Sequence, residues 1–333
     1  MNNILLSICI PVYNFGAFIG KTLESIISQA SDAVEIVVVD GASTDNTIDV
    51  IKTYQKRFPR LRYHRLEKRG GIDRDMAKTV ELAAGNYCWL FSGDDIMRPG
   101  AISRALNELS SEIDLLLCES MLCGFDMHPV TKHKMLDIDA KQVFDLGNKN
   151  DRLRYFRLAR NTGAFFSFCG ALIFKKDVWN LVAFNEAFAG SCWAHAARFF
   201  EIIPRGLKVK YLPDPFLDKR GDNDSFLDKG IVNRYKLGID GYHRLADAFF
   251  GHDSIEAFHI RRVVQHEFPP HVLLHAKLEC HDNNLHEDRL VLDRLAYQAY
   301  SDPVIISRIY LYIYKLTPLL FYRILKSIRA MFK

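Results

Sequence analysis

The chain has 333 residues, of which 49% are apolar and 25% charged, with a net charge of +4 and an isoelectric point near 8.6. This composition is typical of a globular protein and excludes a disordered or fibrous chain. The net charge is too small for a protein that neutralises a phosphate backbone, so we expect no nucleic-acid partner. The seven cysteines form no Cys-x-x-Cys pair, which favours reduced thiols in a cytoplasmic protein.

From residue 5 to about residue 212, apolar runs of strand length alternate with segments of helical period. Strands are expected at 5–12, 35–40, 61–66, 86–91, 114–120, 170–174 and 208–213, and helices at 19–29, 47–58, 75–85, 100–109 and 177–184. This alternation predicts an α/β domain with a doubly wound, mostly parallel sheet. The first run has no basic region ahead of it, so it indicates a strand and not a signal peptide.

The chain changes character after Pro213. A polar, turn-rich loop, DPFLDKRGDNDSF, precedes a histidine-rich and mostly helical stretch that runs to about residue 300. Residues 301–333 then mix Ile, Leu, Phe and Tyr with six Lys or Arg. A membrane-spanning helix needs about 20 residues with almost no charge, so we expect an amphipathic segment that lies in a membrane interface. The alternative is a helix that packs on the protein's own core.

Acids and turn residues follow three of the predicted strands. Asp40 ends one strand, Asp94 and Asp95 follow another, and Tyr13 and Asn14 follow the first. Open α/β sheets bind ligands beyond the carboxyl ends of their strands, so these side chains are expected to converge. Adjacent carboxylates are hard ligands that suit Mg²⁺ or Mn²⁺, with a substrate diphosphate completing the coordination shell.

Three ordered motifs lie in the first 95 residues: SICIPVYN at 7–14, EIVVVDGASTDNT at 35–47, and GGIDRDMAK running on to CWLFSGDD at 70–95. Together they resemble the inverting, GT-A type glycosyltransferases of family 2. With GSCWAHAARFF at 190–200, they are most similar to the abequosyltransferase-like subset, which adds a dideoxyhexose to a lipid-linked O-antigen unit. The resemblance is strong over the first 100 residues and weak beyond residue 230.

The resemblance implies a GT-A nucleotide-diphospho-sugar transferase domain in residues 1–215. It also implies a donor-closing loop and helical extension in 216–300, followed by the membrane-associating segment in 301–333. The expected reaction moves a sugar from a CDP-, UDP- or other nucleotide diphosphate to a polyprenyl-diphosphate-linked oligosaccharide, in O-antigen or surface polysaccharide synthesis. We therefore expect a peripheral protein on the cytoplasmic face of the plasma membrane.

The resemblance also implies which residues form the site. Asp95, with Asp94, is expected to bind the divalent metal, and Ser92 stands where the family usually has a third acid. Arg220 is expected to clamp the diphosphate, since its guanidinium matches phosphate oxygens. The residues expected to bind the donor are Pro11, Tyr13, Asp40, Ser43, Asp73, Arg74, Asp94, Trp193 and Arg220.

The catalytic base is less clearly marked. Residues 184–195 lack the acidic pair that supplies the base in most relatives, and His195 is the nearest proton acceptor in that stretch. Imidazole is chemically suited to this role, whereas the alternative for His195 is a structural hydrogen bond. Asp222 and Asp224 remain alternative bases, and Trp193 either stacks on a sugar or fills the core.

Two other functions stay open at this point. A nucleotidyltransferase-like enzyme would use the same acids, but it predicts a phosphate loop rich in Gly, Lys and Arg near the first strand, where the chain reads PVYNFGAF. A catalytically inactive protein that binds sugar nucleotides or acts as a scaffold is suggested by the missing acidic pair. A Rossmann dehydrogenase is disfavoured because no G-x-G-x-x-G follows the first strand.

Overall fold

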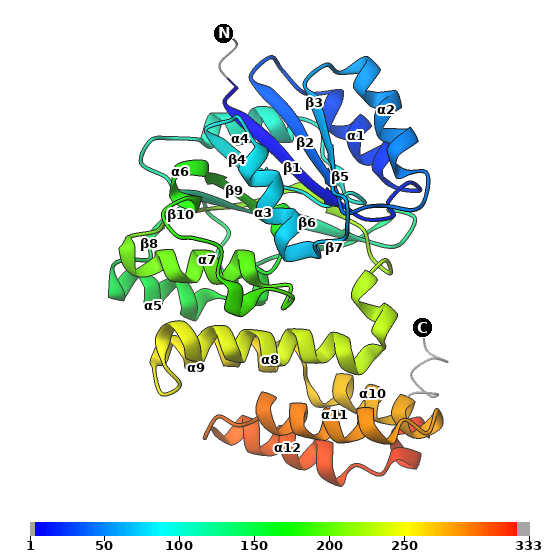
Figure 1. Cartoon of the computed structure of the whole chain (residues 1–333). Helices are drawn as coiled ribbons and strands as arrows, with labels where there is room; N and C mark the ends of the chain where they lie inside the picture. The colour runs from blue at the N-terminus through cyan, green and yellow to red at the C-terminus, as the bar shows by residue number, and fades with distance from the viewer. Residues whose placement is uncertain (1–3, 325–333) are drawn as a thin grey trace. The chain divides into compact units, whose positions relative to one another are not determined.

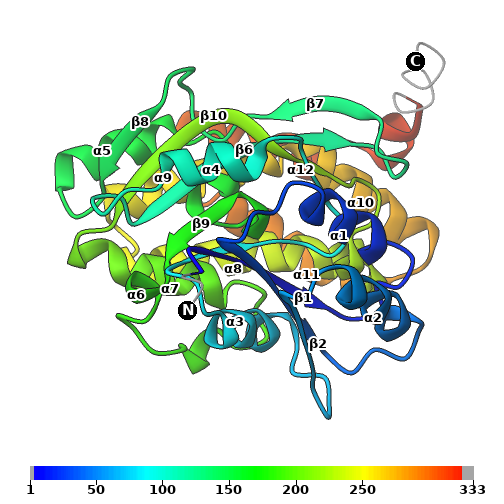
Figure 2. The same cartoon turned by 90° about the horizontal axis from the view of Figure 1, so that it is seen from above.

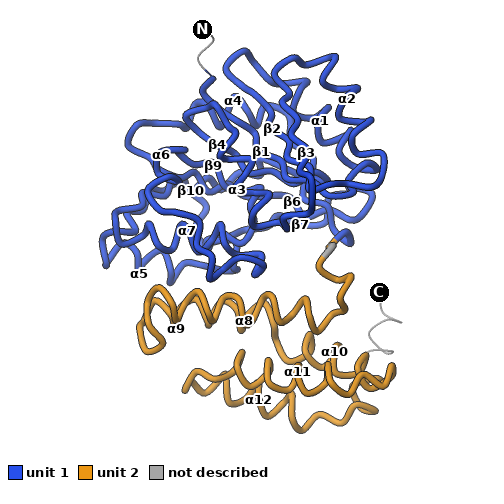
Figure 3. Tube along the Cα trace, in the orientation of Figure 1, with its two compact units in different colours: residues 1–223 blue, residues 224–333 orange. Residues whose placement is uncertain are grey.

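The computed structural model describes residues 4–324, and the chain divides into two compact units, Met1–Asn223 and Asp224–Lys333 (Figure 3). The domain boundary expected at residue 215 falls within a strand, β10, that continues to Lys219. Prolines at 213 and 215 shift the register of this strand without ending it. Residues 1–3 of the expected first domain, and the expected membrane-associating segment from 325 onward, lie outside the described residues.

The first unit has a single sheet with helices on both faces (Figures 1 and 2). Its strands are β1 (Leu6–Val12), β2 (Val34–Asp40), β3 (Leu61–Arg65), β4 (Tyr87–Leu90), β5 (Ile96–Met97), β6 (Leu115–Cys123), β7 (Pro129–His133), β8 (Gln142–Asp145), β9 (Leu172–Lys175) and β10 (Lys208–Lys219). Its helices are α1 (Ile19–Ile27), α2 (Thr47–Arg57), α3 (Ile72–Leu82), α4 (Ala101–Glu108), α5 (Lys149–Leu158), α6 (Lys176–Trp179) and α7 (Ala194–Ile202).

The sheet order is β3-β2-β1-β4-β9-β6-β10-β5, with β7 paired to β6 and β8 paired to β10. The pairs β3-β2, β2-β1, β1-β4 and β6-β10 are parallel, whereas β9 runs antiparallel to both of its neighbours. All seven predicted strands are present, and the α/β fold class is confirmed. The sheet is mixed, and its continuous parallel part carries the three sequence motifs.

β1 and β2 are buried along their whole length, as expected for parallel strands covered on both faces. Two of their polar residues, Ser7 and Glu35, bond to each other and to the amides of Gly85 and Ala84. A side chain at Gly85 would come within 2.7 Å of the Ser7 hydroxyl, so this turn needs glycine. The buried polar pair therefore fixes the entry into β4.

The helix predicted at 177–184 is only one turn long. Arg198 on α7 donates to the carbonyls of Trp179 and Val182, at 2.7 and 2.5 Å, and lies over the Trp179 ring. These carbonyls therefore accept hydrogen bonds from a side chain and not from the amides of a further helical turn. α5 was not predicted, although Asn148 caps it by accepting from the amides of residues 150 and 151.

The second unit is helical, as predicted: α8 (Ile231–Phe250), α9 (Ile255–Glu267), α10 (Pro270–Asp282), α11 (His286–Ala299) and α12 (Ile305–Leu316). Between residues 4 and 324, no helix has both the length and the apolar character needed to cross a membrane.

His243 on α8 is a buried histidine whose Nε2 has no hydrogen-bond partner in the described part of the chain. Burial, and then the nearby charges of Arg261 and His252, lower the pKa of His243 to about 3. The imidazole is therefore neutral in the folded protein over the whole physiological range.

This shift predicts loss of stability in acid. Between pH 6.5 and 3 the unfolded chain binds a proton at His243 that the folded chain does not, so the free energy of unfolding falls as pH falls, by up to about 1.4 kcal/mol per pH unit. Urea unfolding at a series of pH values between 7 and 4.5 measures this dependence. In His243→Gln the free energy of unfolding should fall less steeply with falling pH than in wild type, by the equivalent of about one bound proton. Substitution of the exposed His128 by Gln is the control and should leave this pH dependence unchanged. Equal pH dependence of His243→Gln and wild type would contradict the expectation.

Candidate active site

The parallel pairing of β1 with β2 and β4 brings the predicted strand ends to one edge of the sheet. Val12, the last residue of β1, pairs with Asp40, the last residue of β2. Just beyond β4, the amide of Phe91 donates to the carbonyl of Cys9. The loops after these strands therefore leave at the carboxyl edge, where open α/β sheets bind ligands.

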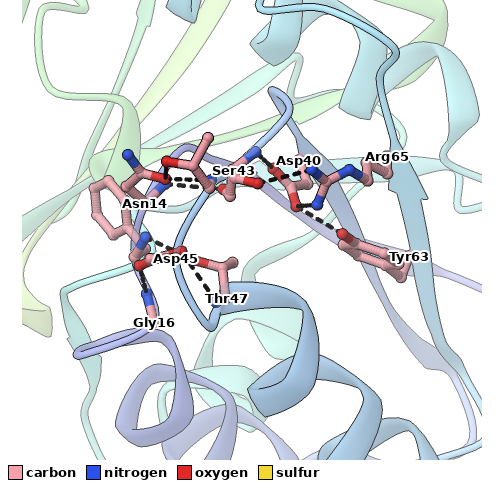
Figure 4. Close-up of polar contacts among 10 residues, drawn as sticks. Asn14, Gly16, Asp40, Ser43, Asp45, Thr47, Tyr63 and Arg65 are labelled. Atoms are coloured by element: carbon pink, nitrogen blue, oxygen red, sulfur yellow. Dashed lines mark hydrogen bonds and ion pairs between the residues drawn. The ribbon is translucent and has the colours of Figure 1, made fainter.

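Side chains of the first two motifs hold the loops after β1 and β2 together (Figure 4). Asn14 has a left-handed backbone with φ of 58°. Its amide donates to Ser43 Oγ at 2.9 Å, and its Oδ1 accepts from the Thr44 amide at 2.8 Å. Asp45 accepts from the amide of Thr47 at 3.0 Å. These motif residues therefore build the loops, and the hydroxyl of Ser43, which was predicted to bind the donor, accepts from Asn14.

Asp40 is fully buried, and both of its carboxyl oxygens have protein donors (Figure 4). Oδ1 accepts from the Ser43 amide at 2.7 Å, while Oδ2 accepts from the Tyr63 hydroxyl at 2.6 Å and lies 3.5 Å from Arg65 Nη1. Burial and the bond to this carboxylate raise the pKa of Tyr63 to about 12. Because a carboxylate has about four acceptor positions, Asp40 can accept another donor while it braces β2 against β3.

Two further residues that are expected to bind the donor lie on or next to β1. Pro11 is buried within the strand, and Tyr13 is partly exposed just after it. The guanidinium of Arg69 lies over the Tyr13 ring, 3.9 Å from the ring centroid. This cation–π pair places the loop after β3 against the loop after β1.

Asp75 on α3 is a site candidate that the sequence analysis missed. It is buried, and its Oδ1 has no hydrogen-bond partner among residues 4–324. Side chains added at Gly41 and Gly70 would come within 2.7 and 2.5 Å of its carboxyl oxygens. Burial raises the pKa of Asp75 to about 6. The Gly-Gly pair ahead of the helix was the available signal, but of the two acids that follow it only Asp73 was chosen.

Asp73 and Arg74 connect α3 to the segment that leads into α7. Asp73 accepts from the amides of Cys192 and Ala194, each at 3.0 Å. The Ala194 amide is one of the N–H groups that the start of α7 leaves without an intrahelical partner. Arg74 forms a two-pronged ion pair with Glu186, at 3.2 and 2.6 Å. Both residues were predicted to bind the donor, but their described hydrogen bonds and ion pairs go to this segment.

The acids Asp94 and Asp95 end the loop after β4, and both are buried. Asp94 accepts from the Ser92 hydroxyl at Oδ1 and from Asn223 Nδ2 at Oδ2, the latter at 2.7 Å. Asp95 Oδ1 accepts from the Arg220 amide at 2.9 Å, whereas Oδ2 is buried with no hydrogen-bond partner among the described residues. Burial, and then the charge of Asp94, raise the pKa of Asp95 to about 7.

The end of β10 places two cations beside this pair. Arg220 Nε donates to the Asp94 carbonyl at 3.1 Å, and Nη1 donates to the carbonyl of Phe125. The positive charges of Lys219 and Arg220 both favour the ionised form of Asp95. Arg220 therefore lies where a diphosphate clamp is expected, although the hydrogen bonds described for its guanidinium go to backbone carbonyls.

The acid pair fits a divalent cation that is shared with a substrate. Two adjacent carboxylates supply hard oxygen ligands, and the buried Oδ2 of Asp95 meets no donor within the described part of the chain. In the same residues no group of three or more His, Cys, Asp or Glu side chains is placed to hold a metal by itself. A cation bound here would therefore take its remaining ligands from substrate and water.

His195 lies on the first turn of α7 and is almost completely buried. Its Nε2 is 2.9 Å from the carbonyl oxygen of Phe166, which can only accept, so we assign the proton to Nε2 and the lone pair to Nδ1. Nδ1 has no hydrogen-bond partner among the residues that the structure describes. Burial lowers the pKa of His195, which keeps the ring neutral at pH 7. The Trp193 ring lies 6.3 Å from the imidazole, centroid to centroid.

The two alternative bases are less well arranged. Asp224 accepts from the amide of Phe226 at 2.9 Å with one carboxyl oxygen, and from Arg234 Nε at 2.5 Å with the other. Asp222 is exposed and has a left-handed backbone with φ of 54°. Among the three predicted bases, His195 is thus the one whose basic atom is buried and forms no hydrogen bond with a described residue.

The loop at 166–169 connects the acid pair to the histidine. Phe166 provides the carbonyl that bonds to His195. Burial, and then the charge of Asp95, raise the pKa of Cys169 in the same loop to about 12. The structure therefore brings Asp40, Ser43, Asp94, Asp95 and Arg220 to the sheet edge, and groups Asp73, Trp193 and His195 at the start of α7.

Solved structures support the fold. The chain aligns with S. aureus TarS 1–349 in complex with UDP-GlcNAc at a TM-score of 0.61 and 17% identity, covering 98% of this chain and 92% of that one. It also aligns with the mannosyltransferase PcManGT from Pyrobaculum calidifontis, in complex with GDP-Man and Mn²⁺, at a TM-score of 0.54 and 17% identity, covering 98% and 84%. At such identities the likeness shows the fold alone, which is the predicted GT-A type.

Sequence comparison shows the family. Residues 7–182 match the glycosyl transferase family 2 model. The chain is also 31% identical over 252 residues to abequosyltransferase RfbV of Salmonella typhimurium, an alignment that covers 74% of this chain and 75% of that protein. Both matches confirm the resemblance seen in the motifs, and the chain therefore belongs to glycosyl transferase family 2 and is a glycosyltransferase.

Proposed function

We propose that this glycosyltransferase is an inverting enzyme that uses a nucleotide diphosphate sugar as donor. The observation that carries the proposal is the buried Oδ2 of Asp95, which accepts no hydrogen bond from any described residue and lies beside Asp94 at the carboxyl edge of the sheet. A sugar-nucleotide diphosphate with its cation supplies the positive charge and the ligands that this pair lacks. The UDP-GlcNAc and GDP-Man complexes of the two structural neighbours support this class of donor.

The abequosyltransferase relative supports a more specific proposal. The donor sugar is a dideoxyhexose, and the acceptor is a glycan linked to a polyprenyl diphosphate in O-antigen or surface polysaccharide synthesis. Such an acceptor lies in a bilayer, so the enzyme works as a peripheral protein on the cytoplasmic face of the plasma membrane.

In this proposal the nucleoside lies against Tyr13 and Asp40, where Asp40 still has an acceptor position. Pro11, Ser43, Asp73 and Arg74 shape the pocket through the loops that they hold. Asp95 and Asp94 hold Mg²⁺ or Mn²⁺, which when bound neutralises charge on the diphosphate leaving group. Arg220 places a further positive charge next to that group.

The transfer itself exchanges one bond for another. The acceptor oxygen bonds to the anomeric carbon while the bond from that carbon to the diphosphate oxygen breaks, which inverts the configuration. The hydroxyl proton of the acceptor passes to Nδ1 of His195, whose Nε2–H is held by the Phe166 carbonyl. Trp193, beside the imidazole, stacks on a sugar face.

Thermal unfolding with a panel of CDP, UDP, GDP, ADP and dTDP, with and without Mn²⁺, tests the donor site. One nucleotide should raise the melting temperature more than the others, and Mn²⁺ should increase the effect. At a hundredfold excess over Kd the expected stabilisation is about 2.7 kcal/mol. Asp95→Asn keeps an acceptor for the Arg220 amide but removes the charge, so it should abolish the Mn²⁺-dependent part.

The matched control is Asp139→Asn, because the Asp139 side chain is 87% exposed and pairs with Lys134 at the surface. This variant should respond to nucleotide and Mn²⁺ like wild type. Indifference of the wild-type protein to all five nucleotides would overturn the proposed donor class.

The role of His195 is tested by His195→Gln. A Gln amide still donates to the Phe166 carbonyl but has no basic nitrogen, so kcat should fall by about 10² to 10⁴ while nucleotide-induced stabilisation stays unchanged. In the wild-type enzyme the acid limb of the pH profile of kcat should lie below pH 6.5, because burial lowers the pKa of this imidazole.

Asp222→Asn and Asp224→Asn serve as comparisons for the alternative bases, and neither should change kcat by more than a few-fold. If His195→Gln retains full kcat, the histidine has a structural role only. A large loss in Asp222→Asn or Asp224→Asn would transfer the role of base to that loop.

A further inference from the structure

α12 carries its apolar side chains on the outside. Six large apolar residues of this helix are 42–78% exposed: Ile305, Ile306, Ile309, Tyr312, Ile313 and Leu316. At about 100° per residue, they occupy roughly a third of the helix circumference, on one side. Leu320, Phe321 and Ile324, which follow in the chain, are also 51–70% exposed. We call these nine residues the outer apolar face.

The opposite side of α12 is attached through polar groups. Ser307 and Tyr314 are its buried residues. Ser307 Oγ accepts from Gln265 Nε2 at 3.0 Å, and the Tyr314 hydroxyl donates to Asp293 at 2.6 Å. The Tyr314 carbonyl also accepts from the buried Lys277 Nζ at 2.8 Å.

A second anchor lies just ahead of the helix. Asp302 forms an ion pair with Arg261, at 2.8 Å to Nη2 and 2.9 Å to Nε, and both residues are almost fully buried. Polar contacts to α9, α10 and α11 therefore fix the rotation of α12 about its axis. An amphipathic helix that covers its own domain core shows the reverse orientation, with its apolar side inward.

The positive charge of the chain is concentrated in the same segment. Residues 301–333 contain six Lys or Arg and a single acid, Asp302, whereas the other 300 residues have 38 basic and 39 acidic side chains. The net charge of +4 thus comes from the last tenth of the chain. Arg308 and Lys315 are exposed at neighbouring angular positions along one border of the outer apolar face.

We propose that the outer apolar face, on α12 and the residues that follow it, inserts into the interfacial region of an anionic lipid bilayer, with Arg308 and Lys315 at the headgroups. The apolar side chains match the acyl boundary, the Tyr rings match the headgroup level, and the cations match anionic lipid. A second copy of the chain is the poorer partner, because pairing two such faces would bring two strongly positive segments together. This membrane contact rests on the peripheral location proposed under the function. It specifies which surface of the protein meets the bilayer and how α12 is oriented there.

Flotation of the full-length protein with lipid vesicles tests the proposal. Binding should be strong to phosphatidylcholine vesicles in which about a third of the lipid is phosphatidylglycerol, and weaker to phosphatidylcholine alone or at high salt. The double variant Ile309→Asp/Leu316→Asp should reduce the bound fraction at least about tenfold. Arg308→Gln/Lys315→Gln should remove most of the dependence on anionic lipid.

Leu181→Asp is the matched control, because Leu181 is an exposed leucine in the first unit, 53% accessible, and its substitution should leave vesicle binding unchanged. Each variant should keep the wild-type melting temperature and the nucleotide response, which do not depend on lipid. Equal vesicle binding by wild type and the Ile309→Asp/Leu316→Asp variant would overturn the proposal. So would a concentration-dependent dimer that the same variant dissociates.

Discussion

The register of the four parallel strands β3, β2, β1 and β4 is the constraint on which the rest of the site depends. It aligns Val12 with Asp40 and Cys9 with Leu90, so three loops of quite different sequence begin at one edge. A slip of one residue would turn Asp40 away from Tyr63 and Ser43 and break the brace between the loops. Because β1 and β2 are buried along their whole length, such a slip would cost much free energy. The positions of the polar groups at the strand ends are therefore fixed.

The site also holds negative charge that the folded protein alone does not balance. Asp75 and Asp95 each have a buried oxygen that meets no donor in residues 4–324, and burial raises the pKa of both carboxyls. Such groups reduce stability in the ligand-free state and are expected where a ligand will complete them. Arg220, Lys219 and Asn223 compensate in part, and they all come from the chain at the end of the first unit.

Local patterns predicted much of this structure. Apolar periodicity was enough to find the seven strands, and the ordered motifs were enough to find the family and the acid pair. The backbone contacts of Asp73 and Arg220 could not be predicted, because each joins residues about 120 positions apart in the sequence. Asp75 was missed because an acid stands on each side of Arg74 in the sequence. The feature that marks Asp75 as a site candidate, its packing against Gly41 and Gly70, is visible only in the structure. The short α6 depends on Arg198, a residue outside its own segment.

The polar attachment of α12 has a practical consequence for anyone producing this protein. Truncation before residue 305 is a common way to remove an apolar C-terminus that causes aggregation, but here it would remove the hydrogen-bond partners of the buried Gln265 and Lys277. Such orphaned groups cost about 1–3 kcal/mol each, and more when charged, a large part of the stability of a small domain. Solubility is therefore better improved by substituting the outward side chains one at a time, with the helix left in place.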